Sequence, residues 1–164
     1  MLEHVKHTFE PIFDQNSKIL ILGTFPSVKS REGDFYYGHP RNRFWLVLAN
    51  ILRVETPETI DEKKKMLLEG KVAIWDVIES CDIKGSSDSS IRNVVPADIN
   101  KILNKAPIVQ IYANGEKAFQ LYMKYCFADT KRDIIKLPST SPANAAWSID
   151  RLIARWRNNI VNNL

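Results

Sequence analysis

The clearest structural signal of the sequence is the run of residues Lys18-Ile19-Leu20-Ile21-Leu22-Gly23-Thr24-Phe25-Pro26-Ser27. Its first half is a short apolar run closed by glycine, which is typical of a strand buried on both faces of a sheet. Three later runs share this brevity and β-branched content, at residues 71–76, 108–113 and 133–137. Helical patterns separate them, at residues 44–52, 57–69, 96–104 and 116–127. Strands alternating with helices predict a parallel sheet with helices on both faces.

Both ends of the chain are predicted to be helical. Pro11 interrupts the N-terminal pattern, so we expect a helix that ends near this proline, with Phe9, Ile12 and Phe13 packed on the core. The last segment is an amphipathic helix whose apolar face carries Ile149, Leu152, Ile153, Trp156 and Ile160. Residues 85–90 are the only polar, flexible loop that we expect, and the length of 164 residues indicates one domain, 1–164.

Composition restricts the class of protein only weakly. The 23 Lys and Arg against 19 Asp and Glu give a formal net charge of +4, which permits an anionic partner without requiring one. The two cysteines lie far apart and there are only three histidines, so we expect no metal site, disulfide or cofactor. No apolar segment has the length of a signal peptide or a membrane span, so we expect a cytoplasmic protein with no membrane partner.

The residues that follow the four predicted strands are distinctive. In open parallel sheets, ligands bind beyond the carboxyl ends of the strands. Those positions hold the turn 23–27, Asp76-Val77, Asn114-Gly115 and the Pro/Ser/Thr segment 138–142. A generic doubly wound enzyme for small molecules stays an alternative, although the chain has no GxGxxG or P-loop signature.

Two further motifs point to a family. Residues 37–45 are Tyr-Gly-His-Pro-Arg-Asn-Arg-Phe-Trp, and residues 137–142 are Leu-Pro-Ser-Thr-Ser-Pro. Together with the turn 23–27, they resemble the site loops of the uracil-DNA glycosylase superfamily, most closely its deoxyinosine (hypoxanthine) branch. The resemblance implies a three-layer α/β/α sandwich around a four-stranded parallel sheet. It also implies a monomeric hydrolase that removes a deaminated base flipped out of DNA and leaves an abasic site, without cofactor or metal.

The resemblance also implies catalytic residues. Other branches have an Asp or Asn in the first turn where this chain has Phe25, and this branch is similar in placing an Asn in the following His-Pro-Arg-Asn. Asn42 is then expected to hold the attacking water. Asn42 could equally cap the helix that begins near Phe44. His39 could donate to the base or to a phosphate, or could tie its own loop to the backbone.

Base binding is expected from residues at the strand ends and from one aromatic ring. Tyr37 stands where mismatch-specific relatives stack an aromatic ring on the flipped base. Asn114 and Asp76 could supply the donor and acceptor that hypoxanthine requires, although a turn or a helix cap would also explain them. The substrate-binding residues that we expect are Gly23, Thr24, Phe25, Tyr37, Asp76, Asn114 and Ser139.

DNA contacts are expected mainly from the segment after the fourth strand. Ser139 stands where relatives place a His or Asn, and the neighbouring hydroxyls suit phosphate binding. Relatives push an apolar side chain into the duplex from the position of Ala143, where the small side chain makes a weak wedge. Arg41 and Arg43 are candidates for phosphate contacts. The expected DNA-binding residues are Ser27, Arg41, Thr140, Ser141, Ala143 and Asn144. A polar turn that caps the last helix would explain the same segment.

Two other functions fit the same motifs. Uracil or xanthine could be the base removed, because stacking and water positioning do not distinguish these bases. A catalytically silent module that binds damaged DNA would explain the missing carboxylate or amide in the first turn. No lysine stands at a motif position, so an enzyme of this type is expected to hydrolyse the glycosidic bond without cutting the strand.

Overall fold

A four-stranded parallel sheet forms the centre of the protein, as the sequence predicts. The computed structural model describes residues 1–164. The strand order is β3-β2-β6-β7, and every neighbouring pair is parallel. The strands are β2 (Ile19–Gly23), β3 (Val72–Asp76), β6 (Gln110–Asn114) and β7 (Ile134–Leu137). Each lies within one residue or two of the range expected from its apolar run.

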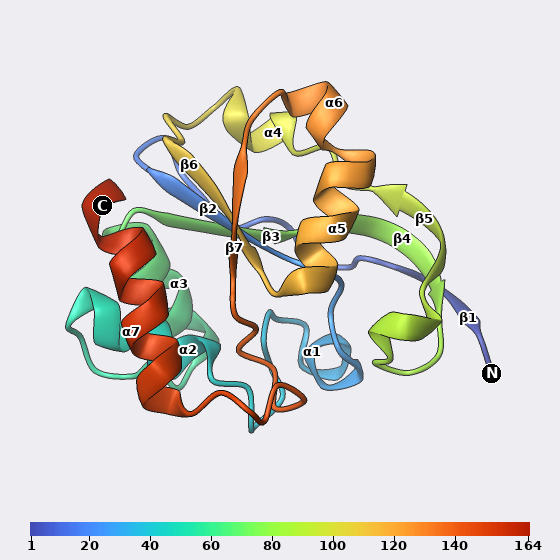
Figure 1. Ribbon diagram of the computed structural model, residues 1–164, viewed down its shortest axis with the longest axis horizontal. Helices are drawn as coiled ribbons and strands as arrows, with labels where there is room; N and C mark the ends of the chain where they lie inside the picture. The colour runs from blue at the N-terminus through green and yellow to red at the C-terminus, as the bar shows by residue number, and fades with distance from the viewer.

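Helices cover both faces of this sheet and make three layers (Figure 1). One face carries α2 (Phe44–Leu52), α3 (Ile60–Glu69) and α7 (Ile149–Ile160), and the other carries α4 (Asn100–Leu103), α5 (Glu116–Tyr125) and α6 (Phe127–Thr130). Strand β2 contributes to both cores, because successive side chains of a strand point to opposite faces. Leu20 and Leu22 belong to the apolar cluster of the α5 face, and Ile19 and Ile21 to that of the α7 face.

A second sheet lies beside the first and corrects the prediction for the N-terminus. It is antiparallel, in the order β1-β4-β5, with β1 (Glu3–Lys6), β4 (Ile78–Ile83) and β5 (Arg92–Pro96). The predicted N-terminal helix is therefore wrong, because β4 supplies hydrogen-bond partners that the local pattern could not reveal. Phe9, Ile12 and Phe13 do pack against the apolar clusters as expected.

The helix ends follow local capping chemistry. Helix α2 has the predicted bounds, whereas α3 begins at Ile60 because Thr59 and Glu62 form a capping box at its start. A short helix, α1 (Val28–Gly33), follows the first turn, and its N-cap is Ser27. The expected polar loop contains a 3-10 turn, Asp88–Ser90, and a second one, Val161–Asn163, follows α7. Only four residues of the predicted helix 96–104 are helical, as α4.

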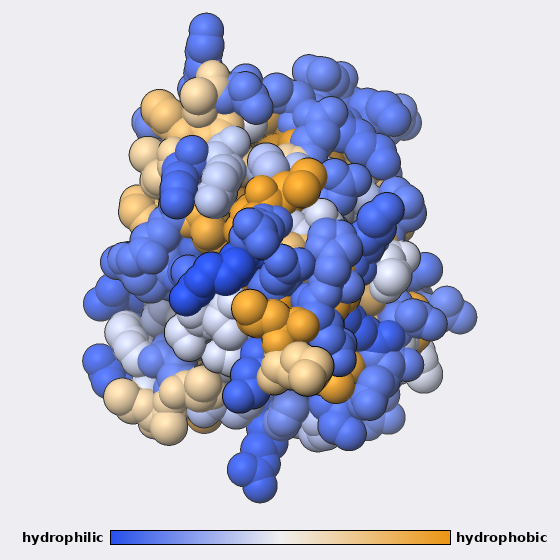
Figure 2. Space-filling model, turned by 90° about the vertical axis from the view of Figure 1, so that its right-hand side faces the viewer, coloured by the Kyte–Doolittle hydropathy of each residue, from blue (hydrophilic) through white to orange (hydrophobic).

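The surface on the side of the antiparallel sheet is mainly hydrophilic, and its apolar residues form separate small patches (Figure 2). None of the helices combines the length and the apolar composition that crossing a membrane requires.

Candidate active site

A cavity of about 320 Å³ opens at the carboxyl ends of the parallel strands. The segments around it follow different strands, so residues far apart in the sequence meet there. Its lining consists of residues 23–27, Ser30, Tyr36, Tyr37, His39, Asn42, Asp76, Ser86, Asp88, Asn114 and residues 139–143. All the residues expected from the sequence to bind the substrate or perform catalysis are in this set.

Asn42 lines the cavity, and both lone pairs of its side-chain oxygen are occupied. Oδ1 accepts a hydrogen bond from the backbone N–H of Phe44 at 2.9 Å and from the hydroxyl of Thr140 at 2.8 Å. The first bond ties Asn42 to the first residue of α2, but the N-cap residue of that helix is Arg43, so the cap considered for Asn42 is wrong. The amide nitrogen Nδ2 has no partner within the protein and is the group left for a ligand or water.

Asn114 and Thr140 lock the loop after β7 onto the end of β6. The Nδ2 atom of Asn114 donates to Thr140 Oγ1, and its Oδ1 atom accepts from the backbone N–H of Thr140, each at 3.0 Å. Thr140 is fully buried. Its side chain therefore does not reach a phosphate, which corrects the expectation that it binds DNA. These bonds use one of the two N–H donors of the Asn114 amide, and Asn114 lines the cavity together with Tyr37.

Tyr37 has an uncommon backbone conformation. Its φ is 52°, in the left-handed region that residues other than glycine seldom adopt and that is frequent at functional sites. The ring stacks on Phe44, with centroids 4.0 Å apart and planes 17° apart, so Phe44 covers one face, and Tyr37 lines the cavity. Its buried hydroxyl has no hydrogen-bond partner. Burial, followed by the charge of Asp76, raises the pKa of Tyr37, so the phenol stays protonated at neutral pH.

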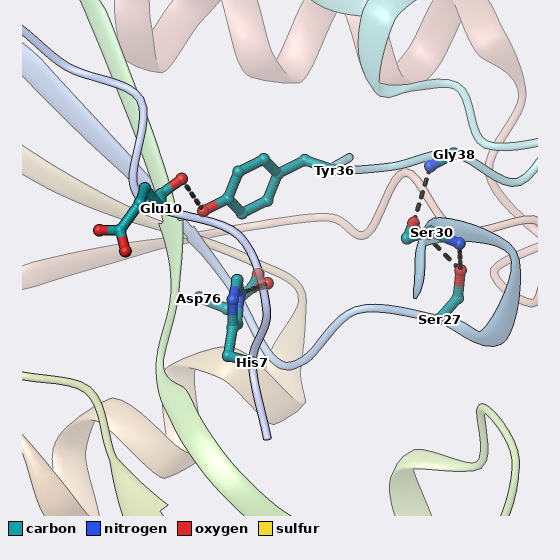
Figure 3. A network of polar contacts seen from close by, with 7 residues as sticks. All are labelled: His7, Glu10, Ser27, Ser30, Tyr36, Gly38 and Asp76. Carbon is teal, nitrogen blue, oxygen red and sulfur yellow. Dashed lines mark hydrogen bonds and ion pairs between the residues drawn. The ribbon is translucent and has the colours of Figure 1, made fainter. Parts of the chain in front are cut away.

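Asp76 is a buried carboxylate at the end of β3. Its Oδ2 atom lies 2.8 Å from Nε2 of His7, and the two side chains are only 6 % and 4 % exposed (Figure 3). The helix cap considered for Asp76 is wrong, because strand β4 follows. The other oxygen, Oδ1, faces the backbone of Gly23, where a Cβ atom would lie 2.4 Å away. Gly23 therefore allows the first turn to approach this carboxylate closely.

The loop that carries His39 is a tight turn. The carbonyl of His39 accepts a hydrogen bond from the backbone N–H of Asn42 at 2.9 Å, and its Nδ1 atom accepts from the backbone N–H of Arg41 at 3.0 Å. The second bond makes Nδ1 the acceptor, which leaves the proton of a neutral ring on Nε2. His39 thus ties its loop with one nitrogen and can donate to a ligand with the other.

Arg43 has a structural role in place of the phosphate contact considered from the sequence. Its guanidinium donates to the backbone carbonyls of Ser141 at 3.0 Å and Asn144 at 3.1 Å, and also to that of Trp147. Its backbone N–H donates to the carbonyl of Thr140 at 3.1 Å. The arginine therefore holds the loop 140–147 in place beside the cavity.

Four of the expected DNA-binding residues line the cavity, namely Ser27, Ser141, Ala143 and the buried Thr140, whereas Arg41 and Asn144 do not. Arg41 and Ala143 are exposed, and Ser27, Ser141 and Asn144 are half-buried. Ser27 Oγ accepts from the backbone N–H of Ser30 at 3.1 Å, so it caps α1. Ser139 Oγ and Ser141 Oγ accept from the backbone N–H groups of Ser141 and Ala143, both at 3.1 Å. Ser139 and Ser141 shape their own loop and keep their hydroxyl protons for other partners, whereas Ser27 donates its proton to Ser30 Oγ at 3.2 Å.

Several polar residues of this region were not predicted from the sequence: Ser30, Tyr36, Ser86 and Asp88, which line the cavity, and His7. Ser30 Oγ accepts from the backbone N–H of Gly38 at 2.8 Å and so connects α1 to the segment that carries Tyr36 and Tyr37 (Figure 3). His7 forms the pair with Asp76, which is 69 residues away, so no local spacing could have indicated it. The best sequence signal for His7 would have been a polar residue beside Phe9, in a segment that was expected to pack on the core.

The remaining reactive groups do not point to metal or thiol chemistry. No group of three or more His, Cys, Asp or Glu side chains is placed to hold a metal ion. Burial raises the pKa of Cys81 and of Cys126 to about 11, so both thiols stay protonated at neutral pH.

Comparison with known proteins gives a consistent family. The family model described as the uracil DNA glycosylase superfamily matches residues 10–160. A protein of Methanosarcina acetivorans named hypoxanthine DNA glycosylase is 32% identical over 151 residues, which cover 90% of this chain and 93% of that protein. A protein of the same name from Methanosarcina barkeri is 32% identical over 116 residues, 69% of this chain and 73% of its own length.

A solved structure agrees with these relatives. A solution NMR structure from Methanosarcina acetivorans, whose description names a uracil DNA glycosylase, superposes with a TM-score of 0.76 at 30% identity. The superposition covers 92% of this chain and 95% of the other. The chain therefore belongs to the uracil DNA glycosylase superfamily.

Proposed function

We propose that the protein is a monofunctional DNA glycosylase that hydrolyses the N-glycosidic bond of a deaminated base, chiefly hypoxanthine in deoxyinosine. The observation that carries the proposal is the shared cavity of Asn42, Tyr37 and Asp76, at the carboxyl ends of the sheet. The cavity brings together the amide nitrogen of Asn42, which has no partner within the protein, the aromatic ring of Tyr37 and the carboxylate of Asp76. The two Methanosarcina relatives named for hypoxanthine favour that base.

The aromatic ring and the strand ends would hold the flipped base. The free face of Tyr37 offers stacking worth about 1–3 kcal/mol, which tolerates many bases. Discrimination needs polar partners, because a buried group left unpaired rejects the wrong base. Hypoxanthine presents N1–H and O6, whereas adenine presents an acceptor at N1 and an amine at C6. Asp76 would accept the N1–H, and the free N–H of Asn114 would donate to O6.

Hydrolysis would then proceed by charge separation. The bond between N9 of the base and C1′ of the sugar breaks, the sugar becomes positive and the base negative, the oxygen of water bonds to C1′, and the proton that this water loses neutralises the departing base. Asn42 would hold that water through Nδ2, because its Oδ1 atom is already occupied. An amide is too weak a base to deprotonate water early, so electrostatic stabilisation supplies most of the acceleration.

The charges of this transition state would be stabilised from two sides. Backbone N–H groups of the turn 23–27 and Nε2 of His39 are the candidate donors towards the base. The phosphates, held by Arg41 and the serine-rich loop 139–143, lie beside the sugar cation in the bound DNA. None of the residues that line the cavity is a lysine, so no Schiff base with the sugar is expected and the strand stays intact.

The test is base release from oligonucleotides that contain deoxyinosine, deoxyuridine, deoxyxanthosine or normal bases, with alkali to reveal abasic sites. Deoxyinosine should be cleaved fastest. The Asn42→Ala variant should retain DNA binding and lose most excision, whereas Asn104→Ala, at an exposed position outside the cavity, should behave as the parent. Full activity of Asn42→Ala would remove the mechanism, and binding without any abasic product would favour the silent-module alternative.

We further propose that the protein acts as a monomer in the cytoplasm, with cellular DNA as its partner. Gel filtration of the protein with and without an abasic-site duplex tests the monomer, and a protein that elutes as a dimer would contradict it.

A further inference from the structure

His7 is the one buried histidine next to the cavity, and the N-terminal strand brings it there. It follows β1 directly, and its backbone N–H donates to the carbonyl of Glu79 on β4 at 2.6 Å. Three aromatic rings surround its imidazole, those of Phe9, Phe25 and Tyr36, with centroids 4.9–6.0 Å away. The family match begins at residue 10, so His7 lies outside it.

The only polar contact of this imidazole is with Asp76. Nε2 lies 2.8 Å from Oδ2, and Nδ1 is buried without any partner. A proton on Nδ1 would be a buried donor without a partner, and it would leave two acceptors, Nε2 and Oδ2, facing each other. The proton is therefore best placed on Nε2, where it is donated to the carboxylate. A phenylalanine would fill the same aromatic surroundings without an unpaired nitrogen, so packing alone does not explain a histidine here.

The contact fixes the orientation of the carboxylate. With Oδ2 bound to His7, Oδ1 accepts no hydrogen bond from the protein and lies against Gly23 at the cavity. Oδ1 is therefore the oxygen that the carboxylate offers as an acceptor to a ligand in the cavity. Only the ionised form is a pure acceptor; the protonated form offers a donor that would match N1 of adenine.

We propose that His7 is a positioning residue that holds Asp76 as an oriented acceptor for the N–H that deamination creates on the base. Deamination converts an acceptor ring nitrogen beside an amine into an N–H beside a carbonyl, in adenine and in cytosine alike. His7 would thus set the preference for deaminated over parent bases. The inference rests on the proposed function, and it adds a residue that touches neither the base nor the water.

The experiment compares His7→Phe, which keeps the aromatic packing, with His7→Gln, whose amide can still donate to Asp76. His4→Phe is the matched control, because His4 forms a similar pair with Asp82, 3.0 Å apart, on the exposed part of the antiparallel sheet. Asp76→Ala is made alone and together with His7→Phe. Single-turnover excision of deoxyinosine, binding to a tetrahydrofuran abasic-site duplex, and relative binding of deoxyinosine and deoxyadenosine oligonucleotides are measured.

We expect the rate of deoxyinosine excision to fall about 10- to 100-fold in His7→Phe, because a hydrogen bond to a charged group is lost. His7→Gln should regain most of it, and His4→Phe should match the parent. Binding to the abasic duplex, which has no base to recognise, should not change. In the Asp76→Ala background, His7→Phe should cause no further loss, because His7 acts through the carboxylate.

Other results overturn the inference in distinguishable ways. Parent-like excision by His7→Phe, or equal further losses in the Asp76→Ala background, would remove the positioning role. Loss of abasic-duplex binding by both His7 variants would make the residue merely structural. If the parent releases no base, the proposed function fails. The inference is then decided by binding: a preference for deoxyinosine over deoxyadenosine that disappears in His7→Phe supports it, and an unchanged ratio rejects it.

Discussion

The hydroxyl of Thr140 donates a hydrogen bond to Oδ1 of Asn42, at 2.8 Å and across 98 residues of sequence. The same hydroxyl accepts from Asn114, so one buried threonine connects the loop before α2 with the ends of β6 and β7. The orientation of the Asn42 amide therefore depends on the loop after the last strand as well as on the bond to Phe44, the first residue of α2.

Replacing Thr140 with valine tests this connection, because the volume is kept and the hydroxyl is lost. We expect a loss of about 1–3 kcal/mol in the free energy of unfolding, as donors and acceptors are left unpaired in the interior, and excision at least about tenfold slower. Thr59→Val is the control, since Thr59 caps α3 away from the cavity and should cost about 1 kcal/mol without changing the rate. Parent-like excision by Thr140→Val would show that Asn42 does not need this bond.

Gly23→Ala should impair base excision more than folding. The added methyl would lie 2.4 Å from Asp76 Oδ1 and would push that carboxylate out of place. Gly33→Ala provides the comparison, because nothing lies within 4 Å of a Cβ there. Steady-state kinetics on deoxyinosine should show a large loss for Gly23→Ala alone. Equal activity of the two variants would mean that the position of Asp76 is unimportant.

The ring of Tyr37 and its hydroxyl should have separable effects. Tyr37→Phe removes a buried hydroxyl that has no partner, so we expect unfolding in urea at the parent concentration or slightly above it, with excision retained. Tyr37→Ala removes the stacking surface and should weaken binding of deoxyinosine DNA by about 10- to 100-fold, in line with 1–3 kcal/mol per stacked base. A large loss in Tyr37→Phe would instead assign the hydroxyl a direct role.

Alkaline pH should destabilise the fold through its buried phenols. Burial, followed by the charge of Asp76, raises the pKa of Tyr36 and of Tyr37 above their usual value. The unfolded chain ionises these groups near pH 10, whereas the folded protein keeps them neutral, so their contribution is complete below about pH 10 and is lost above it. Each tyrosine should lower the free energy of unfolding by about 1.4 kcal/mol per pH unit there. Urea titrations between pH 8 and 11 measure the slope, which should be smaller in Tyr36→Phe; an equal slope would contradict the assignment.

The central sheet was predictable because its strands are buried on both faces and therefore consist of unbroken apolar runs. Residues 19–22, all fully buried, are the clearest example. Strands β1 and β4 could not be recognised in the same way. Residues 3–6 are mostly exposed, and β4 contains Glu79, Ser80 and Asp82. Their stability comes from pairing between residues 3–6 and 80–83, which local sequence does not encode.

The site was predictable where a residue stands at the carboxyl end of a strand, as Asp76 and Asn114 do. What these side chains contact was not. The bonds of Asn42 and Arg43 to the loop 140–147 depend on the tertiary structure, and so do the burial of Thr140 and the pair between His7 and Asp76. Spacing indicates which residues gather at one edge of a sheet, but not which of them face one another.

The order in which the strands leave the ribosome has a consequence for when this protein can act. Strand β2 is made first of the four parallel strands, but its neighbour β6 comes after β3 and the antiparallel strands, and β7 with its loop is the last of the four. A nascent chain that stops before residue 139 has neither the partner of Asn42 nor the residues 139–143 that line the cavity. Such a chain should therefore be unable to remove bases from DNA, so that competence appears only after the loop behind β7 has been made.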